Sequence, residues 1–280
     1  MMVTSVVVGV DGSASSTEAL EWAAADARRR GLGLRLVLVC EHARLGREAT
    51  DLCARTLEAA HDRVRPLTDG VQVTTELLTG KAIDALVGES AAADSLVLGS
   101  RGLGGFAGLL IGSVSMGAAG HASCPVVIVR GPSGAQHGRV VVGDDGSSCA
   151  QVALAYAVEQ ARARGALLHV TYAWQMPVSP SHLAGYGAVR ANCGEQELRR
   201  ATERLSAWRE KNPDIAIEGE QIIGHPAEML IKAGEMADLV VVGSRGLGGF
   251  ASAVLGSVSR TVLQHAACSV AVVRPRPRQE

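Results

Sequence analysis

The nonapeptide GSRGLGGFA, from Gly99 to Ala107, recurs letter for letter from Gly243 to Ala251. In both copies the tetrapeptide GSVS begins five residues after the nonapeptide ends, at Gly112 and at Gly256. The sequence around the two copies differs freely. An identical glycine-rich stretch in two different surroundings indicates that the chain needs one particular loop geometry twice.

The repeat extends over both halves of the chain. VVVGVDGS, from Val6 to Ser13, aligns with VVVGDDGS, from Val140 to Ser147, at an offset of 134 residues, whereas the nonapeptides lie 144 residues apart. The second half therefore carries about ten additional residues, which we place in a loop near Pro177–Arg190 because that stretch is rich in Pro, Gly and Ser. For 280 residues we expect two domains, at 1–132 and 138–276.

Both halves alternate between short apolar runs and longer amphipathic segments, which is the pattern of an α/β fold. The runs are apolar throughout, so we expect a parallel sheet that helices cover on both faces. The spacing of Ser15 and Glu18 predicts a capping box at the first helix, and Ser148 with Gln151 predicts one in the second half. The predicted strands of the first half lie near 3–9, 34–40, 71–78, 95–98 and 125–129, and its helices near 15–30, 47–66, 82–91 and 113–121.

Composition and charge exclude several classes of function. Lys plus Arg number 27 and Asp plus Glu number 28, so no net field attracts nucleic acid or an anionic membrane. No apolar run reaches the length of a membrane span, and the first strand pattern begins at about Val3, so we expect a cytoplasmic protein. The six cysteines contain no C-x-x-C pair, and we expect them to be reduced.

The glycine loop does not fit the two commonest nucleotide motifs. Gly102 to Ala107 matches G-x-G-x-x-A, but it follows the fourth predicted strand rather than the first, and no acidic residue lies about 20 positions on. A P-loop is also excluded, because the chain contains no G-x-x-x-x-G-K-[ST] sequence.

A different spacing, G-x2-G-x9-G-S, predicts a phosphate-binding site. Gly99 and Gly102 should let the backbone adopt conformations that other residues resist. Gly112 and Ser113 open a helix, where free N–H groups and the positive end of the helix dipole attract anions. The hydroxyls of Ser113 and Ser115 would add donors.

Asp11 and Asp145 end the first strand of each half. A carboxylate would repel phosphate, so these side chains should face ribose hydroxyls or an adenine amine, unless each merely caps the following helix. For one nucleotide to touch both the Asp and the glycine loop, strands one and four must be neighbours. This predicts two tandem Rossmann-like domains, each a five-stranded parallel sheet of order 3-2-1-4-5 with its ligand at the carboxyl ends of the strands.

These motifs resemble the universal stress protein family in its tandem form, in the branch whose domains carry G-x2-G-x9-G-[ST] for ATP. The resemblance runs from Val6 to Arg130 and from Val140 to Arg274, and the wording GSRGLGGF is similar to mycobacterial members. It implies an adenine nucleotide, ATP, in each domain, with Val39 and Ala173 against adenine. The candidate nucleotide-binding residues are Gly9, Val10, Asp11, Val39, Gly99, Arg101, Gly102, Gly112, Ser113, Val114 and Ser115 in the first domain, and Gly143, Asp144, Asp145, Ala173, Gly243, Arg245, Gly246, Gly256, Ser257, Val258 and Ser259 in the second.

The function of such sites leaves alternatives open. We favour a regulator that binds ATP, because neither loop contains a Lys, His or Glu placed to activate water. The alternatives are a weak ATPase or nucleotidyl-transfer enzyme, or a nucleotide-free interaction module. Asp144 stands where the first half has Val10, and this extra acid would either weaken nucleotide affinity or help to hold a divalent cation such as Mg2+. Arg101 and Arg245 either reach the phosphates or are solvated.

The last predicted strands, Val126–Val129 and Val270–Val273, offer apolar edges. They could pair between the two domains or between two chains. The family resemblance implies a homodimer, which we expect to use these strands.

Two H-x-x-C pairs occur at equivalent positions, His121 with Cys124 and His265 with Cys268. Each pair offers two metal ligands where a closed zinc site needs four, so we assign them structural roles. The basic tail, Arg274–Arg278, should be solvated.

Overall fold

A computed structural model describes residues 5–41, 46–104, 110–131, 137–174, 187–247 and 254–275. Most of the loop expected near Pro177–Arg190 lies outside these ranges. Its last four residues, Gly187–Arg190, are helical rather than loop, because they begin the long helix α6 (Gly187–Lys211).

The described strands form one ten-stranded sheet of order β3-β2-β1-β4-β5-β10-β9-β6-β7-β8. Each half is parallel and follows the predicted order 3-2-1-4-5. The two halves meet at their fifth strands, so the strand order of the second half is reversed along the sheet. The strands are β1 (Ser5–Gly9), β2 (Gly33–Cys40), β3 (Val73–Thr79), β4 (Ser95–Gly99), β5 (Val126–Val129), β6 (Arg139–Gly143), β7 (Leu167–Trp174), β8 (Ile217–Ile223), β9 (Leu239–Gly243) and β10 (Ser269–Val273).

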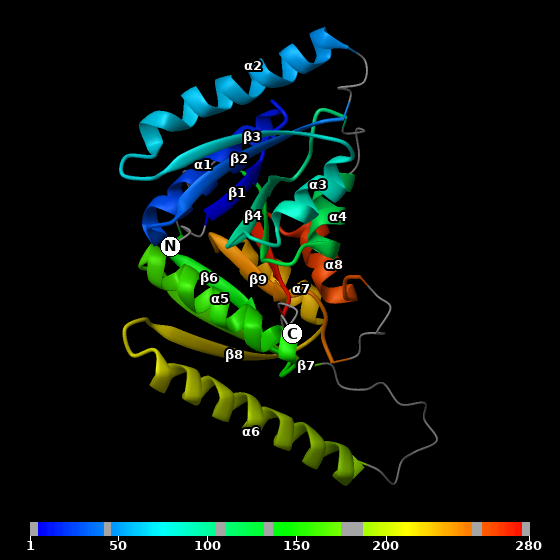
Figure 1. Cartoon of the computed structure of the whole chain (residues 1–280). Helices are drawn as coiled ribbons and strands as arrows, with labels where there is room; N and C mark the ends of the chain where they lie inside the picture. The colour runs from blue at the N-terminus through cyan, green and yellow to red at the C-terminus, as the bar shows by residue number, and fades with distance from the viewer. Residues whose placement is uncertain are drawn as a thin grey trace, which may run out of the picture.

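Helices cover both faces of the sheet, as predicted. Besides α6 they are α1 (Ala14–Arg30), α2 (Arg47–Val64), the 3-10 turn η2 (Arg65–Leu67), α3 (Ala82–Glu89), α4 (Ser113–His121), α5 (Ser148–Arg164), α7 (Pro226–Gly234) and α8 (Ser257–His265). Val6 and Val8 of β1 point into one core with α1, α2 and α5, whereas Val7 points into the other with α3, α4, α7 and α8. Figure 1 shows α2 and α6 at opposite ends of the molecule. Within the described ranges, no helix is both long and apolar enough to cross a membrane.

The start predicted for the first strand, near Val3, lies outside the described residues. The other boundaries predicted for the first half differ from the observed ones by at most two residues. The predicted capping boxes are wrong. Ser13 caps α1 by accepting the Ser16 N–H at 3.1 Å, and Ser147 caps α5 by accepting the Ala150 N–H at 3.1 Å. The cap lies two positions before Ser15 because the Asp-Gly-Ser turn already leads directly into the helix.

The two domains join through their last strands. β5 and β10 pair antiparallel, with Val127 opposite Ala271. These two residues are equivalent at the offset of 144, so the joint lies on a pseudo-twofold axis. β4 and β9 occupy the outer sides of β5 and β10, which leaves neither last strand with an open edge. A homodimer would therefore need a surface other than the edges we expected.

Helices α1 and α5 meet across the same axis. Asp26 of α1 is fully buried, and its carboxylate accepts from Arg30 Nη1 at 3.3 Å. From the other domain, Arg164 Nη2 donates to it at 3.3 Å and Gln160 Nε2 at 3.4 Å. Arg164 and Gln160 are the repeat equivalents of Arg30 and Asp26 at the offset of 134. One buried carboxylate thus binds guanidinium groups of both domains.

Two arginines close the other side of the joint. Arg130, just after β5, donates to the Ala266 carbonyl at 2.6 Å at the end of α8, and Arg274, just after β10, donates to the Ala119 carbonyl at 3.1 Å near the end of α4. A cation at a helix C-terminus is favourable. Burial lowers the pKa of both guanidinium groups, yet an arginine remains charged at neutral pH. The expectation of a solvated tail is therefore wrong for Arg274.

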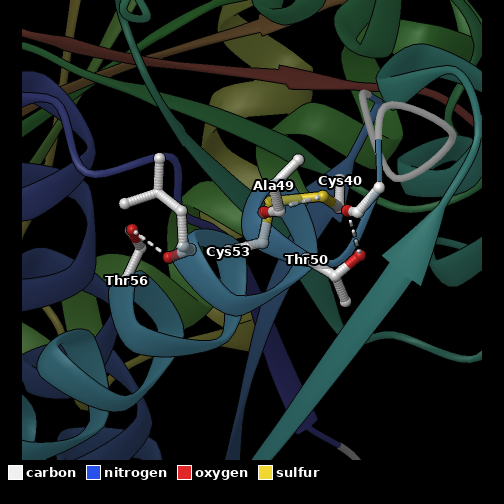
Figure 2. Close-up of a disulfide and its surroundings, with 7 residues drawn as sticks. Cys40, Ala49, Thr50, Cys53 and Thr56 are labelled. Carbon is white, nitrogen blue, oxygen red and sulfur yellow. Dashed lines mark hydrogen bonds between the residues drawn. A yellow bond between two sulfur atoms is a disulfide. The ribbon is translucent and has the colours of Figure 1, made fainter.

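The expectation that the cysteines are reduced is wrong for one pair. Cys40 at the end of β2 and Cys53 in α2 form a disulfide, with Cα atoms 6.0 Å apart (Figure 2). The sequence pattern could not show this pairing, because the two residues meet only when α2 packs back on β2.

Removing the Asp26 carboxylate tests the polar contact between the domains. We expect Asp26→Ala to lower the free energy of unfolding by about 3–5 kcal/mol, because the largely buried Arg164 guanidinium loses the carboxylate with which it pairs. Arg30 keeps its ion pair with Asp94 at 2.6 Å. Urea denaturation measures the change. Asp214→Ala is the matched control, because it removes a carboxylate that pairs with Arg162 at the surface of the molecule. Equal effects of the two substitutions would contradict the structural role of Asp26.

Candidate functional site

The strand order brings most of the predicted site residues to one edge of each half-sheet. β1 lies between β2 and β4, so the ends of all three strands are adjacent. Asp11 follows β1, Val39 is the penultimate residue of β2, and Gly99 ends β4. In the second domain β6, β7 and β9 place Asp145, Ala173 and Gly243 in the same way.

The aspartate after the first strand binds the glycine loop. Asp11 Oδ1 accepts the Ser13 N–H at 2.9 Å, and Oδ2 accepts the Leu103 N–H at 3.1 Å. Asp145 does the same with Ser147 at 3.0 Å and Leu247 at 3.0 Å. Each carboxylate therefore orders the helix-leading turn and reaches across to the loop after the fourth strand. The leucine amides were missed from sequence, although both leucines stand inside the repeated nonapeptide.

The first two glycines of the motif allow close approach rather than unusual dihedral angles. Neither Gly99 nor Gly102 is among the described glycines with positive φ, so our expectation for them is wrong. A Cβ on Gly102 would lie 2.6 Å from Asp11 Oδ2, and a Cβ on Gly99 would lie 2.6 Å from the Ser15 carbonyl carbon. The backbone at these positions must be bare for the loop to sit against the aspartate and α1.

The third glycine of the motif, Gly112 or Gly256, is not required by close packing against described residues. A Cβ on Gly112 would approach no atom closer than 3.5 Å, and one on Gly256 none closer than 3.4 Å, which are ordinary contacts. Gly112 has φ −72° and ψ 155°, and Gly256 has φ −68° and ψ 160°, which any residue can adopt. Nothing in the described part of the protein requires glycine at either position.

The helices that follow these glycines begin without a side-chain cap. α4 starts at Ser113 after Gly112, and α8 starts at Ser257 after Gly256, and neither N-cap accepts a hydrogen bond through a side chain. Ser113 and Ser257 are exposed. By contrast, α1 and α5 are capped by Ser13 and Ser147. The N–H groups at the starts of α4 and α8 are therefore donors that a ligand can use.

Two of the predicted donors point into the protein. Ser115 is buried and its hydroxyl donates to the Gly99 carbonyl at 2.7 Å. Ser259 is buried and donates to the Ser244 carbonyl at 3.0 Å. These hydroxyls hold the helix against the end of the strand, so they do not face the cleft as we expected.

Asp144 is paired inside the second domain. Its Oδ2 accepts from Arg204 Nε of α6 at 2.9 Å, and its Oδ1 accepts the Gly146 N–H at 2.8 Å. Within the part of the chain that the structure describes, no three His, Cys, Asp or Glu side chains gather to hold a metal ion. The extra acid thus has a structural partner that its sequence context did not reveal.

The first H-x-x-C pair also has local partners. The His121 ring lies 2.9 Å from the Gly117 carbonyl of its own helix through Nδ1, and Cys124 is buried. Cys268 is partly buried, and burial raises the pKa of its thiol to about 11. These contacts agree with structural roles.

A surface cavity lies beside each glycine loop, on the side of α1 or α5. Their volumes are about 410 Å³ and 470 Å³. The cavities share only Arg101, Arg245 and Gly246 with the predicted site, and both Gly112 and Gly256 lie outside their linings. The residues between the second and third motif glycines include 105–109 and 248–253, which are not described. The first cavity is lined by Ala14, Ser15, Glu18, Ser100, Arg101, Leu110, Arg130 and Gly131, and the second by His121, Ala122, Ser123, Ser147, Ser148, Cys149, Arg245, Gly246, Arg274 and Pro275.

Comparison with known proteins identifies relatives over the whole length. The family described as universal stress protein matches twice, at residues 2–130 and 137–274. A universal stress protein of Mycolicibacterium smegmatis is 33% identical over 288 residues, covering 97% of each chain. Universal stress protein Rv2623 of Mycobacterium tuberculosis is 35% identical over 295 residues, covering 96% of each chain.

A solved structure shares the two-domain fold. The crystal structure of a universal stress protein from Archaeoglobus fulgidus superimposes with a TM-score of 0.70 at 23% identity, and the match covers 99% of this chain and 97% of that one. At this identity the likeness supports the fold alone. The two family matches and the full-length mycobacterial relatives show that this chain belongs to the universal stress protein family, with two copies of the family's domain in tandem.

Proposed function

We propose that this protein is a regulator that binds one ATP in each of two domains, 1–132 and 138–276. The observation that carries the proposal is the pair of uncapped helix starts at Gly112 and Gly256, where an added Cβ would make only ordinary contacts with the residues that the structure describes. A glycine that packing within the protein does not require is explained if a ligand occupies the space beside it. The helix N-terminus makes that ligand an anion.

The surrounding groups fit a nucleotide. The N–H groups of Ser113 and Val114, and of Ser257 and Val258, would face the phosphates. Each oxygen of the Asp11 carboxylate accepts one protein N–H and retains a second lone pair, which can accept a ribose hydroxyl. Val39 and Ala173, near the ends of β2 and β7, would contact adenine.

A regulatory role fits these residues better than catalysis. Asp144, the acid expected to help position Mg2+, is neutralised by Arg204. Any Mg2+ would therefore enter with the triphosphate. The loops from Gly99 to Ser113 and from Gly243 to Ser257 hold no Lys, His or Glu to activate a water molecule.

The substitution Gly112→Ser should abolish nucleotide binding in the first domain without lowering the stability of the fold. Gly112 has nearly the same dihedral angles as Ser13, the N-cap of α1 at φ −72° and ψ 159°, so a serine there should cap α4. We expect the free energy of unfolding to stay equal or to rise by a few tenths of a kcal/mol. The new side chain would take an amide donor and fill the phosphate space. Isothermal titration should then find one ATP per chain instead of two.

Gly256→Ser is the matched variant for the second domain, and the double variant should bind no ATP. A single variant that still binds two ATP molecules with unchanged affinity would refute the assignment of the phosphate site. Loss of folding would instead show that the third glycine has a structural role.

Release of nucleotide from purified protein gives an independent test. We expect protein denatured in acid to release ATP that chromatography detects, or, where purification removed it, added ATP to raise the melting temperature, because a ligand of the native state stabilises it. Absence of both effects would reject ATP as the ligand.

A further inference from the structure

The disulfide between Cys40 and Cys53 lies at the adenosine end of the first candidate site. Cys40 ends β2 directly after Val39, and Cys53 stands on the facing side of α2 (Figure 2). The bond therefore joins the end of a central strand to a peripheral helix, next to a residue that we place against adenine.

Among the described residues, few others hold the first half of α2 in place. Only Leu57 and Val64 of this helix are buried, and both lie after Cys53. Leu52 is 60% exposed, and Gly46 supplies no side-chain cap. Apolar burial therefore secures the second half of α2, whereas the first half is attached mainly through Cys53.

Residues beside the disulfide lie close to the site. A Cβ on Gly12, which follows Asp11 in the turn, would lie 3.1 Å from Thr56 Cγ2, one turn after Cys53. Glu41, next to Cys40, accepts the Ala82 N–H at the start of α3 at 2.8 Å. The disulfide thus holds α2 against the Asp11 turn and steadies the segment that binds α3.

The second domain holds its corresponding helix in a different way. Arg204 of α6 forms an ion pair with Asp144 at 2.9 Å, and its guanidinium carbon would lie 3.3 Å from a Cβ on Gly146, the equivalent of Gly12. The guanidinium also lies over the Tyr172 ring, 5.9 Å from its centre. The residue equivalent to Cys40 is Trp174. An ion pair therefore attaches α6 to its domain, whereas a disulfide attaches α2 to the other domain.

We propose that the Cys40–Cys53 bond is a reversible thiol–disulfide switch that sets the ATP affinity of the first domain and leaves the second unchanged. The inference rests on the proposed ATP site. Reduction breaks the covalent tie between α2 and the end of β2, so α2 can shift relative to the Asp11 turn beside which Thr56 lies. The Arg204–Asp144 ion pair is insensitive to thiol chemistry, which makes the second domain an internal control.

The chemistry of the switch balances with a dithiol as reductant. One thiolate of the dithiol attacks the sulfur of Cys53, which is partly exposed, whereas Cys40 is 2% exposed. Cys40 leaves as a thiolate and takes up a proton. The second thiol of the dithiol then attacks the mixed disulfide, which releases Cys53 as a thiol and the reductant as a cyclic disulfide. Two electrons pass to the protein.

Oxidation by a hydroperoxide reverses the change. One cysteine thiolate attacks the O–O bond, forming a sulfenic acid and, after protonation, an alcohol. The other thiol displaces water from the sulfenic acid and restores the disulfide.

Titration of the full chain with ATP before and after treatment with dithiothreitol tests the switch. The Gly256→Ser background isolates the first site, and Gly112→Ser isolates the second. We expect reduction to expose two additional thiols and to weaken the first site about tenfold, which is within the ordinary range of coupling between sites. The second site should not change. Hydrogen peroxide should restore the first site after the dithiol is removed.

Two cysteine variants control for other thiol effects. Cys53→Ser should behave like the reduced protein under both conditions. Cys268→Ala removes a thiol that burial keeps protonated, and it should retain the full response. Equal ATP affinity of the first site with the bond formed and broken, or a bond that dithiothreitol cannot reduce in the folded protein, would overturn the switch. Absence of ATP binding in either state would instead overturn the proposed function.

Discussion

The hydrogen bond from the Leu103 amide to the Asp11 carboxylate, repeated by Leu247 and Asp145, is the contact on which both candidate sites depend. It joins the end of the first strand to the loop after the fourth, so it can form only in a sheet where those strands are neighbours. It also requires bare backbone at Gly102 and Gly246, because a Cβ would collide with the carboxylate. The strand order, the glycine spacing and the Asp-Gly-Ser turn that occurs in both halves are therefore all needed for one close approach.

The joint between the domains is also built from equivalent residues of the two halves. The antiparallel pairing of β5 with β10 covers two sheet edges that could otherwise pair with another chain. Arg130 and Arg274 each bind the C-terminal end of a helix in the other domain. Asp26 holds guanidinium groups of both domains on the opposite face. The two sites thus belong to one continuous sheet, but their peripheral helices α2 and α6 lie far from the joint (Figure 1) and are held by different chemistry.

Periodicity was sufficient to predict the buried parallel strands and the bounds of α4, because apolar strand runs and the G-S helix start are local signals. The sheet order followed from placing the strand-one aspartate and the glycine loop against one ligand, which requires strands one and four to be neighbours. These signals were insufficient for the partners of polar side chains. Ser115, Asp144 and Arg274 were expected to face ligand or solvent, and each instead binds a residue at least 16 positions away. The Cys40–Cys53 bond was missed for the same reason. Pairings of this kind depend on how helices pack on the sheet, which spacing along the chain does not encode.

A crystal structure of the protein grown with ATP tests the central claim most directly. The account predicts electron density for a triphosphate at the first N–H groups of α4 and of α8, a ribose beside Asp11 and Asp145, and the two leucine amides still bound to those carboxylates. Nucleotide found instead in the cavities beside α1 and α5, or both helix starts left without a ligand at saturating ATP, would contradict it.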